Sequence, residues 1–130
     1  MAHILVIDDE SILLDLISRT LRQGGHTVTA MSDPIAAMSS FSEGKPRVDL
    51  VLTDVDMRPI NGFELVRRVT KAGFKGPALF MSGYPDLASA MACSADPYSF
   101  IDKPFTIHQL RAAVGRILAK RAKKCDAGRE

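Results

Sequence analysis

Five short apolar segments alternate along the chain with segments of helical periodicity, and this alternation restricts the possible fold more than any other feature. The apolar segments are short and bounded by polar or glycine-containing turns, which favours buried strands over turns of helix. They cover residues 4–7, 27–31, 48–54, 77–81 and 98–101. Strands that alternate with helices are typical of a parallel sheet covered on both faces, and right-handed crossovers favour a doubly wound topology. We therefore expect an α/β fold with a five-stranded parallel sheet and five helices.

Capping residues and glycines mark the expected helix boundaries. Gly24 ends the first helix, and Asp33 before a proline predicts the start of the second. Asp86 is expected to cap a short fourth helix that ends near residue 94, and Thr106 with Gln109 predicts a capping box for the last helix. The apolar residues expected to face inward from the second and the last helix are Ile35, Met38, Phe41, Ile107, Leu110, Val114, Ile117 and Leu118.

Length and charge narrow the class of protein. A chain of 130 residues is long enough for one domain with a full hydrophobic core. The net charge of +2 comes from the last eleven residues, which hold five basic and two acidic side chains, so the body is nearly neutral and unlike a nucleic-acid binder. Cys93 and Cys125 lack metal or disulfide spacing, and neither a signal peptide nor a membrane span is recognisable. We expect a cytoplasmic protein.

Four of the five expected strands are followed by side chains that can perform chemistry. Asp8 and Asp9 follow the first strand, Asp54 ends the third, Ser82 follows the fourth and Lys103 the fifth. Taken singly, each has a simpler explanation, such as favourable charge at a helix N-terminus, a turn or a solvated lysine. Because the carboxyl ends of parallel strands share one edge of the sheet, we expect these side chains to converge.

This combination of side chains points to phosphoryl chemistry. Three adjacent carboxylates repel one another, and a hard divalent cation with few protein ligands, such as Mg²⁺, relieves that repulsion. A lysine and a hydroxyl opposite them suit the oxygens of a phosphoryl group. The sequence therefore predicts a site that receives a phosphoryl group beside Mg²⁺.

Over residues 3 to about 120 the chain resembles the receiver domains of two-component signalling. The motifs that carry the resemblance are Val6-Ile7-Asp8-Asp9-Glu10, Asp54 with Met57 and Asn61-Gly62, Ser82-Gly83, and Phe100-Ile101-Asp102-Lys103-Pro104-Phe105. The resemblance implies a flavodoxin-like sheet with strand order 2-1-3-4-5, as in chemotaxis regulators. It also implies one receiver domain over residues 3–120, followed by a short basic tail (121–130) without an output domain.

The resemblance assigns a role to each acidic residue. Asp54 is implied as the phosphoacceptor, which attacks a phosphohistidine on a partner protein. Asp54 and Asp9 are implied as direct Mg²⁺ ligands, Asp8 as a ligand mainly through water, and Asp56 as a ligand through its backbone carbonyl.

The remaining motif residues are implied to form a switch. Lys103 is expected to pair with the acceptor carboxylate and with the phosphoryl oxygens, and its peptide bond to Pro104 is expected to be cis. Ser82 is expected to hydrogen-bond the phosphoryl group, so that the aromatic side chain of Phe100 turns inward. This change repacks the surface of the fourth helix, the fifth strand and the fifth helix.

The resemblance also implies partners. A histidine kinase or a histidine phosphotransfer protein would supply the phosphoryl group, and a downstream protein would bind the repacked surface. No nucleic acid or membrane is expected, and the chain is expected to be a monomer or a weak phosphorylation-dependent dimer. It would be a signalling phosphoacceptor with self-catalysed transfer and autodephosphorylation, and not a metabolic enzyme.

Two alternatives stay open. A pseudo-receiver would be a binding module that never carries phosphate; Arg58, at a position where the family usually has proline, keeps that hypothesis in view. Residues 52–56 also resemble the nucleophile motif of haloacid-dehalogenase-type phosphatases. In that family the metal-binding acids follow the nucleophile, whereas here Asp8 and Asp9 precede it, and the order of the motifs favours the receiver.

Overall fold

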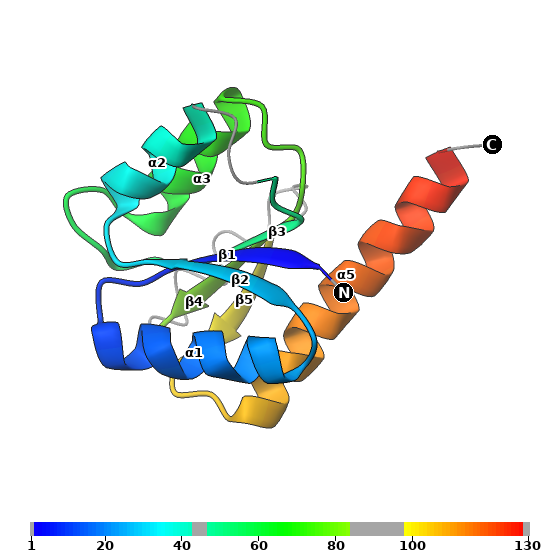
Figure 1. Ribbon diagram of the computed structural model, residues 1–130, viewed down its shortest axis with the longest axis horizontal. Coiled ribbons are helices and arrows are strands. Elements are labelled where there is room, and N and C mark those ends of the chain that lie inside the picture. The colour runs from blue at the N-terminus through cyan, green and yellow to red at the C-terminus, as the bar shows by residue number, and fades with distance from the viewer. Residues whose placement is uncertain (1, 43–46, 84–97, 129–130) are drawn as a thin grey trace.

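The computed structural model describes residues 2–42, 47–83 and 98–128, and its centre is one parallel sheet (Figure 1). The strands are β1 (His3–Ile7), β2 (Thr27–Met31), β3 (Leu50–Asp54), β4 (Ala78–Ser82) and β5 (Tyr98–Asp102). The helices are α1 (Ser11–Gln23), α2 (Pro34–Ser42), α3 (Gly62–Lys71) and α5 (Ile107–Gly128). The sheet order is β2-β1-β3-β4-β5, so the predicted doubly wound fold is confirmed. The helix expected between Asp86 and Ser94 lies outside the described residues.

Alternate residues of the strands pack into two separate hydrophobic cores, one on each face of the sheet. Ile4 and Val6 of β1 pack on the side of α1 and α5, whereas Leu5 and Ile7 pack on the side of α2 and α3. Successive side chains of a strand point to opposite faces, so a strand in the middle of a covered sheet must be apolar throughout. Figure 1 shows the two helical layers on either side of the sheet. We call them the α1/α5 side and the α2/α3 side.

Two of the predicted helix caps lie in the described residues and are present. An Oδ1 oxygen of Asp33 accepts a hydrogen bond from the backbone N–H of Ile35 at 2.9 Å, as expected at a helix start. At the start of α5 the backbone N–H of Thr106 donates to Gln109 Oε1 at 2.8 Å, and the N–H of Gln109 donates back to Thr106 Oγ1 at 3.1 Å. This reciprocal pair is the predicted capping box.

Two residues expected in the core are exposed. The exposed fraction of Ile35 is 41% and that of Ile107 is 44%. Both lie in the first turn of their helices, ahead of the turns that pack on the sheet. Ala37 and Ala113 are buried further along the same two helices. The side chain of Phe41 lies outside the described part of the chain.

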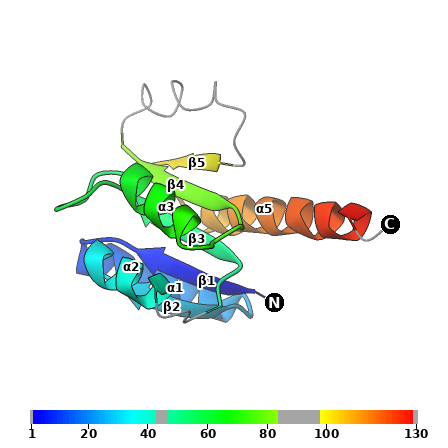
Figure 2. The same cartoon turned by 90° about the horizontal axis from the view of Figure 1, so that it is seen from above.

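Helix α5 extends into the segment that the sequence analysis set apart as a basic tail. Its backbone stays helical through Gly128, so residues 121–128 continue the helix, and α5 projects beyond the sheet (Figures 1 and 2). Across the described ranges, no helix combines the length and the apolar character needed to cross a membrane.

Candidate functional site

The strand ends bring the predicted site residues to one edge of the sheet. Ile7 of β1 pairs with Thr53 of β3, so Asp8 and Asp54 are the next residues on these neighbouring strands. On the other side of β3, β4 ends at Ser82, which pairs with Asp102 of β5 directly before Lys103. The order β1-β3-β4-β5 thus places acid, acid, hydroxyl and amine along one edge, as predicted.

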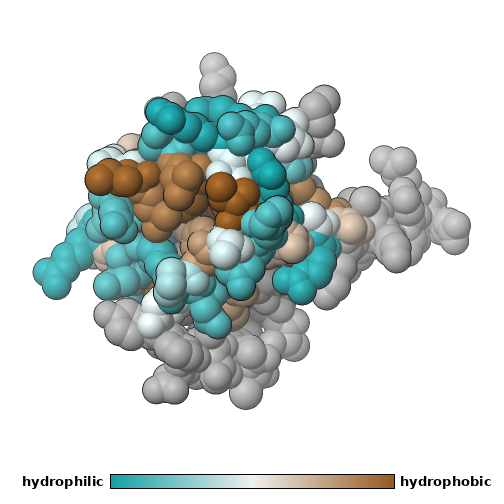
Figure 3. Space-filling view, turned by 90° about the horizontal axis from the view of Figure 1, so that it is seen from below, coloured by the Kyte–Doolittle hydropathy of each residue, from teal (hydrophilic) through white to brown (hydrophobic). Residues whose placement is uncertain are grey.

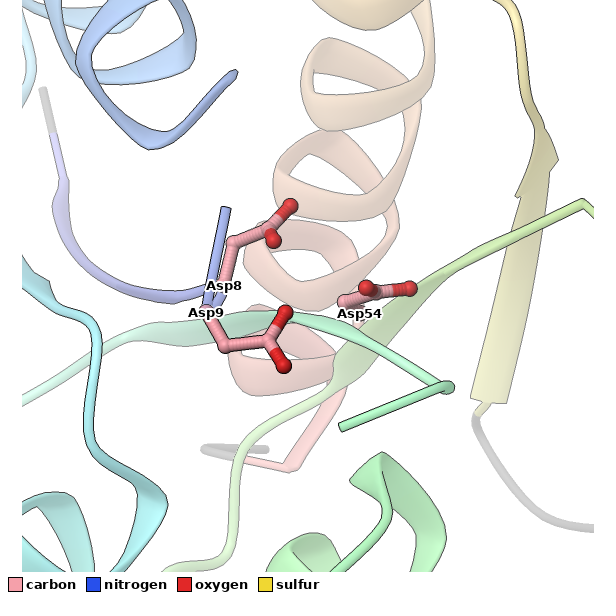
Figure 4. Close-up of side chains that lie close together, drawn as sticks. All are labelled: Asp8, Asp9 and Asp54. Atoms are coloured by element: carbon pink, nitrogen blue, oxygen red, sulfur yellow. The ribbon is translucent and has the colours of Figure 1, made fainter. Parts of the chain in front are cut away.

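The three carboxylates form a compact cluster (Figure 4). One oxygen from each of Asp8, Asp9 and Asp54 lies within 4.8 Å of the others. Asp8 is fully buried, Asp54 is 6% exposed, and Asp9 is exposed to solvent. The acidic residues after β1 do not cap the following helix with a side chain: Glu10 occupies the N-cap position of α1 without a side-chain cap hydrogen bond. A helix-capping role therefore does not account for these acidic residues.

Lys103 joins two members of the cluster. Its Nζ lies 3.3 Å from Asp54 Oδ1 and 3.7 Å from Asp8 Oδ2, and the lysine side chain is 23% exposed. The backbone N–H of Lys103 donates to the carbonyl oxygen of Ser82 at 2.8 Å, which fixes the start of the loop after β5 to the end of β4. The Lys103–Pro104 peptide is cis, as predicted, and so is Arg58–Pro59, which the sequence reasoning did not anticipate.

Burial dominates the acid–base properties of the two inner carboxylates. Desolvation raises the pKa of Asp8, although a backbone hydrogen bond from Glu10 (2.9 Å) and the charge of Lys103 oppose the rise. Desolvation also raises the pKa of Asp54, opposed by Lys103 and by a 3.3 Å hydrogen bond from the backbone N–H of Asp56. A nearby positive charge would lower both pKa values and favour the ionised forms.

One oxygen of Asp8 makes the site suited to a metal ion. Asp8 Oδ2 is buried and has no hydrogen-bond partner within the described parts of the chain, which is costly for an ionised oxygen. It lies beside two further carboxylates, and a set of carboxylate oxygens of this kind is what Mg²⁺ takes as ligands. The residues present therefore fit a hard divalent cation.

A cleft opens from this cluster to the surface. Its volume is about 650 Å³. The residues that line it are Asp9, Glu10, Asp54, Asp56, Gly83 and Lys103. Glu10 and Gly83 belong to the quoted motifs, but the sequence analysis gave neither of them a role in lining a cleft. The cleft leaves the acceptor carboxylate and the lysine within reach of a group presented from outside.

Gly62 supports the acceptor strand from behind. A Cβ added to this buried residue would collide with the carbonyl oxygen of Asp54 and would lie 3.1 Å from its carbonyl carbon. The N–H of Gly62 donates to Val55 O at 2.9 Å, and Asn61 Oδ1 caps α3 by accepting from Glu64 N–H at 2.9 Å. The sequence marked this asparagine–glycine pair as a motif, but its packing against Asp54 was not predicted.

The other two expected switch residues lie where the sequence placed them. Ser82 is buried at the end of β4, with 1% of its surface exposed. Phe100 of β5 is half-buried and packs on the α2/α3 side of the sheet. Asp56 is exposed and adjoins the cleft; the use of its carbonyl as a ligand stays a prediction.

The fold and the site together define a doubly wound α/β domain with an acidic, lysine-containing cleft at the carboxyl edge of its sheet. Residues 4–115 match the family described as the response regulator receiver domain. The chain belongs to this family. Receiver domains are the phosphoacceptors of two-component signalling, and histidine kinases or phosphotransfer proteins phosphorylate them.

Known proteins agree with this assignment. The chain is 32% identical over 120 residues to the DNA-binding transcriptional regulator NtrC of Rhizobium meliloti and, over the same length, to the sensor kinase CckA of Brucella abortus. The match covers 92% of this chain in both cases but only 24% and 13% of those longer proteins. A crystal structure of a response regulator receiver protein from Sinorhizobium medicae is 32% identical, with a TM-score of 0.79 over 92% of this chain and 96% of that one.

The buried carboxylates predict how stability depends on pH and Mg²⁺. The pKa values of Asp8 and Asp54 are raised above 3.8, so both groups destabilise the folded state above their raised pKa values. That penalty is relieved as the pH falls through the raised values toward 3.8. In EDTA, Asp8→Asn should therefore have a higher Tm than wild type near neutral pH, and the difference should shrink toward pH 4.

Magnesium should reverse the comparison. At neutral pH we expect Mg²⁺ to raise the free energy of unfolding of wild type, and with it the Tm. A ligand that binds only the folded state adds about 2.7 kcal/mol at a hundred times its Kd. Asp8→Asn should respond much less. Calorimetry with EDTA, Mg²⁺ or Na⁺ at matched ionic strength separates the specific effect from screening. Equal responses of the two proteins to Mg²⁺ would contradict this reading of Asp8.

Proposed function

We propose that Asp54 accepts a phosphoryl group from a phosphohistidine of a partner protein. The observation that carries the proposal is the pairing of a buried carboxylate at a strand end with Lys103 Nζ, 3.3 Å away, inside a cluster of three carboxylates. A carboxylate oxygen of Asp54 attacks phosphorus and the P–N bond to the donor imidazole breaks. The electron pair of that bond stays with the imidazole nitrogen, and an acyl phosphate remains on Asp54.

Each remaining site residue has a part in this transfer. Asp8, Asp9, Asp54 and the backbone carbonyl of Asp56 would hold Mg²⁺. When bound, the metal ion supplies positive charge that offsets the carboxylates and the phosphoryl oxygens. Lys103 opposes the effect of burial and favours the ionised form of Asp54, and it then pairs with the new phosphoryl oxygens. The positive charge thus acts where negative charge develops, the most effective place for electrostatic stabilisation.

The output of the transfer is a change of packing. The hydroxyl of Ser82 hydrogen-bonds the phosphoryl group, and the ring of Phe100 settles inward on the same edge of the sheet. The surface that includes β5, α5 and the predicted fourth helix then favours a downstream protein, either as a partner-binding switch or as a step in a phosphorelay. Loss of the phosphoryl group by hydrolysis at the same site resets the domain.

The first experiment is intact-protein mass spectrometry after incubation with Mg²⁺ and a small acyl- or amido-phosphate. We expect one added phosphoryl group on wild type, no addition in EDTA, and no addition to Asp54→Ala. A folded wild type that binds Mg²⁺ but never gains a phosphoryl group would favour the pseudo-receiver. Steady release of phosphate faster than any adduct forms would favour the phosphatase.

An apolar patch beside the cleft suits the partner that donates the phosphoryl group. Ile12 is 82% exposed and Leu16 is 49% exposed, one turn apart on α1, and half-buried Leu13 lies between them in the chain. Figure 3 shows apolar residues gathered on this side of the molecule. We call Ile12, Leu13 and Leu16 the α1 patch. Because α1 begins directly after Glu10, which lines the cleft, a protein seated on the patch brings its phosphohistidine near Asp54.

The double substitution of Ile12 and Leu16 by serine should separate docking from chemistry. We expect transfer from a phosphohistidine protein to slow by about tenfold, because the few central residues that dominate an interface each cost more than about 1 kcal/mol when they are truncated. Transfer from the small phosphate donor should be unchanged, since exposed side chains do not support the site. Lys71→Ser, on the α2/α3 side, is the matched control. Equal slowing with both donors would contradict the docking role.

A further inference from the structure

Three phenylalanine rings from three different elements lie together on the α2/α3 side. Phe63 is in the first turn of α3, Phe80 is in β4 and Phe100 is in β5. The ring centroids are 4.8 Å apart for Phe63 and Phe80, 5.4 Å for Phe80 and Phe100, and 6.2 Å for Phe63 and Phe100. All three pairs are tilted, in the range of separations where aromatic pairs attract.

The rings differ in how firmly they are held. Phe80 is fully buried, so it is a fixed part of the core. Phe63 and Phe100 are half-buried and pack against the same core cluster as Phe80. Phe100 therefore packs on one fully buried ring from the sheet and on one half-buried ring from α3.

Phe63 is also tied to the acceptor strand. It follows Gly62, whose Cα leaves no room for a Cβ against the carbonyl group of Asp54. The hydrogen bond from Gly62 N–H to Val55 O, at 2.9 Å, fixes the same point of the backbone to the residue after Asp54. A short path of direct contacts thus runs from the backbone of Asp54, through Gly62 and Phe63, to the ring of Phe100.

We infer that Phe63 is a positioning residue that holds the ring of Phe100 against the sheet in the unphosphorylated chain. This inference rests on the proposed function, because Phe100 is the aromatic residue of the switch that phosphorylation of Asp54 is proposed to operate. It adds a connection between Asp54 and Phe100 that does not pass through Ser82. In this chain the inward position of Phe100 is supported before any phosphoryl group arrives, and phosphorylation adds to an existing bias.

A tryptophan at position 100 reports on this arrangement, because the natural chain contains no tryptophan. In Phe100→Trp the indole should be shielded from acrylamide. Adding Phe63→Leu should raise the quenching constant about twofold or more and shift the emission to the red, as the population with the ring held inward falls. Adding Phe63→Tyr instead, which keeps a ring at position 63, should preserve the shielding.

Two controls separate ring contact from general loosening. Val69→Ala creates a core defect in the same helix at a buried residue, and it should leave the fluorescence of the Phe100→Trp indole nearly unchanged. Phe105→Trp places the reporter at a half-buried residue of the opposite core, where Phe63→Leu should have no effect. The inference fails if Phe63→Leu leaves the indole at position 100 shielded, or if leucine, tyrosine and Val69→Ala all expose it equally.

The same samples distinguish this inference from the proposed function. Intact mass with Mg²⁺ and the small phosphate donor tests Asp54 independently of the fluorescence. If every variant gains a phosphoryl group while the indole signal does not depend on position 63, the inference is wrong and the proposed function stands. If no variant is phosphorylated but Phe63→Leu exposes the indole, the ring contact is real and the proposed function is wrong.

Discussion

Replacement of Lys103 by methionine should slow phosphorylation of Asp54 by about a hundredfold, the usual cost of removing one preorganised charge from a developing anion. The methionine keeps the apolar stem but removes the only cation that forms an ion pair with Asp8 or Asp54 among the described residues. The rate of adduct formation with the small phosphate donor, followed by intact mass, measures the effect without a protein partner.

The pH profile gives this prediction a second readout. The charge of Lys103 is the largest influence that lowers the pKa of Asp54 against the effect of burial. Without this charge the pKa of Asp54 should rise further. As the pH is lowered, Asp54 should then lose its ionised, nucleophilic form earlier, so the rate of phosphorylation should begin to fall at a higher pH than in wild type. Lys75→Met, at an exposed residue before β4, is the control for losing a positive charge. If Lys103→Met reacts at the wild-type rate, Lys103 has no role in the phosphorylation of Asp54.

Gly62→Ala should damage both stability and transfer. The new Cβ would overlap the carbonyl oxygen of Asp54, a backbone atom that cannot rotate away. Overpacking of this kind costs about 1–3 kcal/mol, which denaturant unfolding will measure. Because the displaced atom belongs to the acceptor residue, the rate of phosphorylation should also fall, by about a hundredfold for a shift near 1 Å.

Gly115→Ala is the matched control for this substitution. Gly115 lies in α5, and a Cβ at this position meets nothing within 4 Å. Alanine is the better helix former by about 0.5–1 kcal/mol, so Gly115→Ala should be slightly more stable than wild type and react at the same rate. If Gly62→Ala matches Gly115→Ala in stability and in the rate of phosphorylation, the close contact between α3 and the acceptor strand is not needed for either.

The features that the sequence predicted are the alternation of strands and helices and the short capping motifs. Buried parallel strands are apolar throughout, and their carboxyl ends share an edge, so the meeting of Asp8, Asp54 and Lys103 followed from the order of the segments. The helix start at Asp33 was predictable because capping depends on a few adjacent residues. These features are local, or they follow from the topology.

The parts that were missed depend on contacts between separate elements. Ile35 and Ile107 have the character of core residues, but their positions in the first turn leave them exposed, which periodicity does not encode. The packing of Gly62 behind Asp54 depends on the path of the loop between β3 and α3. The meeting of Phe63 with Phe100 depends on where α3 lies on the sheet, and no motif records that placement.

The division of the interior into two cores has a consequence for how the domain can be used. The α1 patch lies on the α1/α5 side, and the ring of Phe100 lies on the α2/α3 side, with the sheet between them. Only the strand ends belong to both sides. A donor bound to the α1 patch therefore stays off the side that carries the ring of Phe100. A downstream protein that also covers α5 shares the α1/α5 side with the donor, so only the α5 part of the proposed output surface can be contested during transfer.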